Sequence, residues 1–176
     1  DAQESRGLGD VYKRQARTRA AGLQGRVAVS HAYSLGDVPL ARALQVGEAL
    51  ATAGVAIMSN APGDHPFPPL RALHDAGVRV FAGNDNIRDC WWPYGNGDLL
   101  QRAMLLGYRS GFYTDGDLML ALDMVTTHAA RVIGLPQHGI AEGRPATFVA
   151  VRADHGPAAV AGVPVERRVV VDGRWL

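Results

Sequence analysis

The sequence contains one cysteine, Cys90, and one lysine, Lys13, and it has no long uninterrupted apolar run. A single cysteine excludes an internal disulfide and any zinc site built from several cysteines. The apolar runs fall far short of the roughly 20 residues that a membrane-spanning helix needs, and the polar amino end has no signal-peptide pattern. We therefore expect a cytoplasmic protein without a membrane partner.

The sequence also has no large excess of acidic or basic residues, because 18 basic and 17 acidic residues leave a net charge of +1. This balance gives no electrostatic basis for binding nucleic acid or an anionic lipid surface. With 47% hydrophobic and 20% charged residues, the composition is that of a globular chain. A length of 176 residues suffices for one domain with a buried core.

The first fifteen residues differ in character from the rest of the chain. Lys13 lies within the hexapeptide DVYKRQ (10–15), whereas the other 17 basic residues are all arginine, which is typical of GC-rich coding DNA. The hexapeptide back-translates to GATGTGTATAAGAGACAG, which resembles a transposon end used to prepare sequencing libraries. We interpret residues 1–15 as an adapter or cloning artefact, with a short basic linker as the alternative. We further expect the remainder to be a carboxy-terminal fragment of a longer protein.

From Arg26 onward, short apolar runs alternate with segments of helical periodicity. Strands are predicted over residues 26–30, 55–59 and 78–83, and helices over residues 39–54, 68–77 and 96–111. Strands that alternate with helices predict βαβ units and a parallel sheet. Because these strands are apolar on both faces, we expect helices to cover the sheet on both sides.

The last third of the chain changes from helical to strand-like patterns. Residues 115–135 predict a long helix with a break near Thr126 and Thr127. Residues 146–154 and 167–176 are strand-like, and a hairpin turn is predicted at 171–174. Among the histidines here, His128 is expected at a helix start with a structural role.

Polar residues follow each of the three predicted parallel strands, namely Ser30-His31, Ser59-Asn60 and Asn84-Asp85-Asn86. Parallel strands place their carboxyl ends at one rim, so these residues are expected to converge there. One imidazole and one carboxylate suit hydrolysis by water that a divalent zinc ion activates, and iron(II) accepts the same ligands. As an alternative, Asp85 serves as a helix cap and His31 as a half-buried structural histidine.

Three stretches carry a resemblance to a known family: RVAVSHAYSLGDV (26–38), VAIMSNAP (55–62) and GNDNIRDCWWPYG (83–95). They resemble the cytosine deaminase-like branch of the amidohydrolase superfamily. The resemblance implies an α/β fold in which residues 16–135 form the carboxy-terminal part of a metal-dependent (β/α)8 barrel, about its last three strands. It also implies that residues 136–176 are the β-rich segment of a composite β-sandwich.

The resemblance implies a function and roles for individual residues. Asp85 matches a catalytic aspartate that binds one divalent metal ion, Zn²⁺ or Fe²⁺, and His31 matches a catalytic histidine that contacts the attacking water. Substrate-binding positions are implied for Asn60, Asn86, Asp89 and Trp91, where Asn86 replaces a second aspartate of cytosine deaminase. The implied reaction is hydrolysis of a C–N bond, a deamination, on a nitrogen heterocycle such as cytosine or a related pyrimidine or triazine.

Part of the family's site has no counterpart in this sequence. The His-x-His pair that follows the family's first strand and the His-x-x-Glu segment that follows its fifth are absent. They would supply three metal ligands and the acid–base glutamate, so we expect this chain by itself to bind metal weakly and to be inactive. The alternative is an inactive fragment, isolated from the rest of its protein, or a non-catalytic α/β module that binds small molecules. Relatives commonly assemble through the outer helices of the barrel, which leaves a homo-oligomeric parent open.

Overall fold

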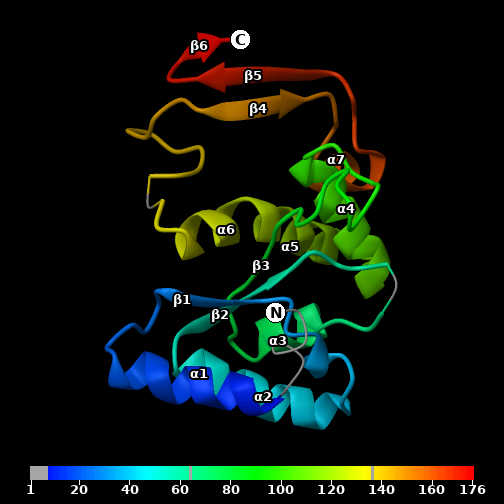
Figure 1. The fold of residues 1–176 in the computed structure, drawn as a ribbon. Coiled ribbons are helices and arrows are strands. Elements are labelled where there is room, and N and C mark those ends of the chain that lie inside the picture. The colour runs from blue at the N-terminus through cyan, green and yellow to red at the C-terminus, as the bar shows by residue number, and fades with distance from the viewer. Residues whose placement is uncertain (1–7, 64, 136) are drawn as a thin grey trace.

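The computed structural model describes residues 8–63, 65–135 and 137–176 and contains two separate three-stranded sheets (Figure 1). The first is parallel, with the order β1 (Val27–Ser30), β2 (Val55–Ser59) and β3 (Val80–Ala82). Its register pairs Val27 with Val55 and Ile57 with Val80. The prediction of a mixed α/β fold with a parallel sheet is therefore confirmed.

Helices follow each parallel strand where the periodicity predicts them. α2 (Leu40–Thr52) follows β1, after the short 3₁₀ turn η2 (Tyr33–Leu35), and α3 (Leu70–Asp75) follows β2. β3 is followed by α4 (Leu99–Ser110), α5 (Asp115–Val125) and α6 (Thr127–Val132). Thr126 has φ −125° and ψ −92° and separates the last two helices, so the predicted break is confirmed.

The core lies between the parallel sheet and its helices. Its largest fully buried side chains include Leu50 of α2, Ile57 of β2, Leu73 of α3, Leu106 of α4 and Met124 of α5. α2 and α3 pack on the sheet from one side, and α5 and α6 lie against β3 (Figure 1). Burial of these apolar side chains is the main force that holds the strand ends at fixed positions.

Two features of the amino-terminal half differ from the prediction. Ala28 and Ser30 of β1 are exposed, so helices within the described residues do not cover this edge strand on both faces. A helix, α1 (Leu8–Ala20), precedes β1 and packs along α2, although no element was predicted there. Val11, Gln15 and Thr18 recur at helical spacing and are all buried. The interpretation of residues 1–15 as an artefact stays a prediction, and residues 1–7 lie outside the described part.

The carboxy-terminal sheet is antiparallel, with the order β4 (Phe148–Val151), β5 (Arg167–Val171) and β6 (Arg174–Trp175). Asp172 and Gly173 both have positive φ, at 49° and 78°, as a two-residue type I′ hairpin requires. The predicted hairpin is thus confirmed.

One helix interrupts the segment that the sequence predicted to be β-rich. α7 (Gly156–Gly162) lies between β4 and β5 and packs on α4 and α5. It begins with a proline at its second position, and the His155 ring accepts a hydrogen bond from the backbone N–H of Ala158, an N-cap interaction. The run is short, and for this reason its helical period was not recognised. No helix within the described residues combines the length and the apolar character needed to cross a membrane.

Candidate active site

Three polar side chains that follow the three parallel strands meet at the carboxyl rim of the sheet. The Nδ2 amide of Asn60, after β2, donates a 2.9 Å hydrogen bond to Oδ2 of Asp85, after β3. The Nε2 atom of His31, after β1, lies 3.9 Å from the same oxygen. The predicted convergence of the strand ends is therefore observed, across up to 54 residues of sequence between His31 and Asp85.

The backbone adopts uncommon conformations where it leaves the strands. The described residues include seven non-glycine residues with positive φ, and four of them lie at this rim: His31, Ala32, Ala61 and Asp85. Such conformations cost energy and persist only when surrounding contacts enforce them, and they gather at functional sites. After β2, one such contact is the hydrogen bond from the Ala61 N–H to the buried hydroxyl of Ser59, at 3.1 Å.

Tyr33 connects the rim residues, although no sequence pattern predicts a role for it. Its hydroxyl donates a 3.1 Å hydrogen bond to Oδ1 of Asn60, which orients the amide so that Nδ2 faces Asp85. Its ring centroid lies 4.9 Å from that of His31 and 4.3 Å, edge to face, from that of His65. The position of Tyr33, two residues after His31, is the one sequence signal that could have identified it.

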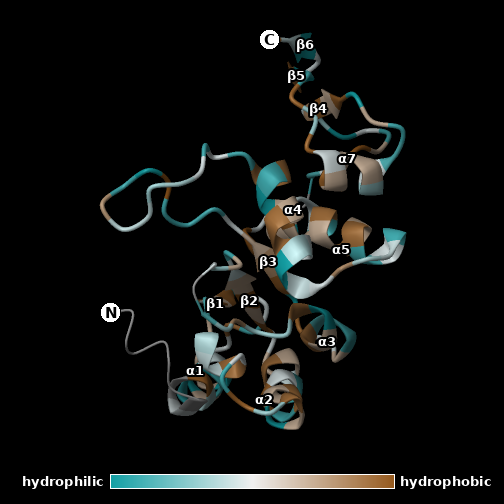
Figure 2. Ribbon diagram, turned by 90° about the vertical axis from the view of Figure 1, so that its right-hand side faces the viewer, coloured by the Kyte–Doolittle hydropathy of each residue, from teal (hydrophilic) through white to brown (hydrophobic). Residues whose placement is uncertain are grey.

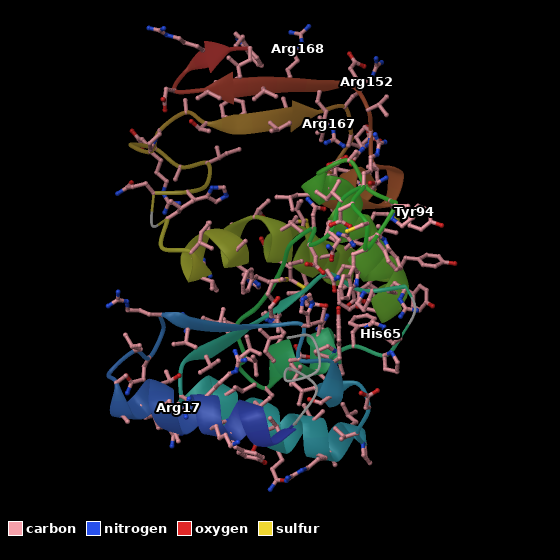
Figure 3. The ribbon with its side chains drawn as sticks, in the orientation of Figure 1. Arg17, His65, Tyr94, Arg152, Arg167 and Arg168 are labelled. Atoms are coloured by element: carbon pink, nitrogen blue, oxygen red, sulfur yellow. The ribbon has the colours of Figure 1, made fainter. Side chains whose placement is uncertain are left out.

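A close backbone approach brings the loop after β2 against the turn after β1. A Cβ atom on Gly36 would lie 2.5 Å from the backbone nitrogen of Phe67, so glycine permits this contact. The contact holds the segment that carries His65 beside Tyr33. Figure 3 shows His65 on the right-hand side of the view, and its backbone carbonyl accepts a 3.1 Å hydrogen bond from Nη2 of Arg109, near the end of α4.

Asn86, Asp89 and Trp91 lie on the long loop between β3 and α4, which projects from the body of the molecule (Figure 2). The Nδ2 amide of Asn86 donates to Oδ2 of Asp89 at 2.6 Å, and Oδ1 of Asp89 accepts from the backbone N–H groups of Trp91 and Trp92. These hydrogen bonds, that from Asn86 first, lower the pKa of Asp89. Trp91 is 73% exposed.

The structure thus brings together only part of the predicted set. His31, Asn60 and Asp85 are neighbours at the rim, whereas Asn86 and Asp89 bond to each other and shape the loop. Trp91 and Tyr94 of this loop are exposed, and Figure 3 shows Tyr94 at the edge of the molecule. Substrate binding by Asn60, Asn86, Asp89 and Trp91 stays a prediction.

The rim residues fit part of a metal site. Asp85 uses Oδ2 for the bond to Asn60, and Oδ1 takes part in no hydrogen bond within the described residues, so it is available as an oxygen ligand. Nδ1 of His31 is buried, and no described residue pairs with it, whereas a histidine ligand usually has a partner for its second nitrogen. This favours Asp85 as the ligand. Across the described ranges no group of three or more His, Cys, Asp or Glu residues could hold a metal ion.

Comparisons with known proteins identify the family of the chain. Residues 1–176 match the Amidohydrolase family. The chain is 34% identical over 147 residues to the N-isopropylammelide isopropyl amidohydrolase of Pseudomonas sp. (strain ADP), and the match covers 81% of this chain and 36% of that protein.

Solved structures give the same result. The N-isopropylammelide isopropylaminohydrolase from Burkholderia multivorans ATCC 17616 matches with a TM-score of 0.91 and 39% identity, over 96% of this chain and 43% of that one. The 5-methylcytosine deaminase from Klebsiella pneumoniae, liganded with 5-fluorocytosine, shares the fold with a TM-score of 0.82 and 24% identity, over 92% and 43%. The chain spans less than half the length of each of these relatives. The chain belongs to the amidohydrolase family.

Proposed function

We propose that residues 16–176 are the carboxy-terminal part of a metal-dependent hydrolase that cleaves an exocyclic C–N bond on a nitrogen heterocycle. The observation that carries the proposal is the convergence of His31, Asn60 and Asp85 at the carboxyl rim of the parallel sheet. In a β/α barrel this rim holds the active site. The three strands would be the last three of the barrel, and the exposed edge strand β1 would be covered by the part of the barrel that precedes it.

The rim residues have complementary tasks in this proposal. A divalent metal ion, when bound, supplies activation of the attacking water. Asp85 would hold that ion through its carboxylate and accept the proton of the water, while Asn60 fixes the carboxylate through Oδ2. Nε2 of His31 lies near enough to the carboxylate to contact the same water and to stabilise the tetrahedral centre that forms at the ring carbon under attack.

The substrate class follows from the loop and from the relatives. The named relatives act on N-isopropylammelide and 5-methylcytosine, which supports a pyrimidine or triazine. Asn86 offers both a donor and an acceptor where a carboxylate only accepts, and it suits a ring that presents both kinds of group. Trp91 and Tyr94 supply exposed aromatic surface on the loop that follows Asp85. The products are the ring carbonyl compound and ammonia or an amine.

The experiment begins with the genomic locus, read upstream of the codon for residue 16 from DNA free of library adapter. We expect an open frame that continues upstream and encodes His-x-His and then His-x-x-Glu. The complete protein, purified with its metal, should release ammonia from cytosine or 5-methylcytosine, or isopropylamine from N-isopropylammelide. An open frame that starts at residue 16, or that lacks those histidines, would contradict the proposal that the complete protein is a hydrolase. Heterocycle binding without any product would instead indicate a binding module.

A further inference from the structure

Arg102, on α4, ties together the two strand ends that present Asn60 and Asp85. Its Nη1 donates to the backbone carbonyl of Asn60 at 2.6 Å, and its Nη2 donates to the backbone carbonyl of Asn84 at 3.1 Å. Its Nε also lies 3.4 Å from Oδ1 of Asn84. One guanidinium group therefore contacts both the residue that hydrogen-bonds the Asp85 carboxylate and the residue that precedes Asp85 in the chain.

A second arginine makes the same kind of contact at the other end of the sheet, where the amino ends of the strands lie. Nη2 of Arg79, next to β3, donates to the carbonyl of Gly54 at 2.5 Å, and Nη1 donates to the carbonyl of Gly25 at 3.4 Å. These carbonyls stand just before β2 and β1. Both arginines are half-buried, so they resemble each other in contacts and in burial but differ in their distance from the rim.

We propose that Arg102 is a positioning residue for the rim site, which holds Asn60 and Asp85 in register by bridging the backbone carbonyls of Asn60 and Asn84. The inference rests on the proposed function for its catalytic consequence, although the bridge itself is a feature of the fold. The sequence gives little indication of this role. Arg102 lies four residues after the α4 cap, Asp98, which places it in the first turns of the helix beside the rim.

The chemistry of the guanidinium group suits this task. Its planar fork presents several donors at fixed angles, so one side chain can bond two carbonyl groups on different strands at once. Burial lowers the pKa of Arg102, and the negative charge of Asp85 acts in the opposite direction. Arginine stays protonated under both influences, and its positive charge interacts with the negative charge of Asp85.

The bridge can be tested by NMR in this 176-residue chain, with Arg102→Met compared to Arg79→Met as a matched control. The probe is the side-chain amide of Asn60, identified by its absence from the spectrum of Asn60→Ala. We expect Arg102→Met to move the two amide proton signals toward those of a free asparagine and to speed their exchange with water, and Arg79→Met to leave them in place. Unchanged signals in Arg102→Met, or equal changes in both variants, would overturn the proposal.

Arg102→Lys replaces Arg102→Met if the latter does not fold. Lysine keeps the charge and the aliphatic stem, but its single nitrogen cannot reproduce the fork, so the signals should move in the same direction by a smaller amount. Signals that stay at the wild-type positions in Arg102→Lys would count against the bridge.

The catalytic consequence is tested in the complete protein. We expect Arg102→Met to lower kcat per bound metal ion at least about tenfold, because small displacements of reacting groups are costly, with a smaller change in KM. Arg79→Met should keep kcat within about twofold of the wild type. Equal losses of kcat in the two variants would show that Arg102 has a structural role and does not position the site. If the wild-type protein turns over none of the heterocycles, the proposed function fails, and the NMR comparison alone decides the bridge.

Discussion

The side-chain amide of Asn60 donates a hydrogen bond to Oδ2 of Asp85 across two neighbouring parallel strands, at 2.9 Å. The bond selects one carboxylate oxygen as the fixed one and leaves Oδ1 for another ligand. The hydroxyl of Tyr33 holds the oxygen of the same amide at 3.1 Å, so the amide cannot rotate without losing both bonds. The rim therefore has an orienting network of its own, and each member can be tested by substitution.

Asn60→Ala in the complete protein is expected to lower turnover per bound metal ion by about 10- to 100-fold, the usual effect of removing a group that orients a metal ligand. The measurement is product release together with metal content. Asn96→Ala is the control and should stay near wild-type turnover, because Asn96 is exposed and its side chain accepts a hydrogen bond from the backbone N–H of Asp98. Similar losses in the two variants would show that the Asn60 amide does not orient Asp85.

Asp98 connects α4 to the antiparallel carboxy-terminal sheet. It caps α4 by accepting a hydrogen bond from the Leu100 N–H, and its two carboxylate oxygens bind the guanidinium group of Arg167 of β5, at 2.8 and 2.5 Å. Asp98→Ala should lower the free energy of unfolding by about 2 kcal/mol, from the lost cap and the lost charged hydrogen bonds. Urea unfolding of both single variants and of the double variant with Arg167→Ala measures the coupling. Purely additive effects would contradict the pairing.

The same pair predicts a dependence on pH. The hydrogen bond from Arg167 is the main cause that lowers the pKa of Asp98 below its ordinary value of 3.8. The stabilisation is then complete above that ordinary pKa and is lost as the pH falls through the lower folded-state value. The difference in stability between the wild type and Asp98→Ala should therefore shrink below about pH 4. Asp154→Ala, an exposed aspartate, should show no such trend.

His74 of α3 and His128 of α6 form a stacked pair of rings, with centroids 5.4 Å apart. Burial first, and then the neighbouring His128, lower the pKa of His74 below 6.5; the other charges that act on it are those of Asp75, Arg71 and Asp123. The folded protein thus binds this proton less readily than the unfolded chain, and stability falls as the pH drops below the ordinary value.

His74→Phe keeps the ring but cannot take up the proton. We expect this variant to lose less stability than the wild type between about pH 7 and pH 5, as measured by urea unfolding at both values. His138→Gln, an exposed histidine, should behave like the wild type. Parallel pH profiles for all three proteins would show that the stacked pair does not contribute to the decline.

Metal binding should differ between this chain and the complete protein. In the part of the chain that the structure describes, Asp85 and His31 offer ligand atoms at the rim, and no group of the three or more ligands that a tight site requires is found. We expect the 176-residue chain to lose zinc and iron on dialysis against a chelator, with metal content measured by elemental analysis. Stoichiometric metal that survives this treatment would mean that residues of this chain complete a site of their own.

Local sequence patterns identified most of the parallel-sheet unit because its strands and helices follow hydrophobic periodicity. The break at Thr126 and the hairpin at Asp172-Gly173 were also predictable from local residue types. α7 was missed because seven residues carry too little periodicity. The exposed face of β1 was missed because its alanine and serine look as compatible with burial as with exposure.

At the site, the sequence could place residues on a common rim but not specify their hydrogen bonds. Because parallel strands have their carboxyl ends at one rim, the positions of His31, Asn60 and Asp85 after such strands were enough to predict that they lie close together. The contacts of Tyr33 and Arg102 depend on side-chain direction and on packing between segments 18 to 42 residues apart, which no local pattern encodes. The hydrogen bond between Asn86 and Asp89 was likewise not predictable from the sequence, although the two residues are only three positions apart.

The most direct test of the central claim is Asp85→Asn in the complete protein, measured as product release per bound metal ion from the heterocycle that the wild type prefers. The substitution keeps the size of the side chain and an acceptor for Asn60 but removes the negative charge. Our account predicts that turnover falls by at least about 1,000-fold, since both a ligand charge and a proton acceptor are lost, while Asp154→Asn retains it. Turnover within a few-fold of wild type in Asp85→Asn would contradict the assignment of Asp85 and with it the active site at this rim.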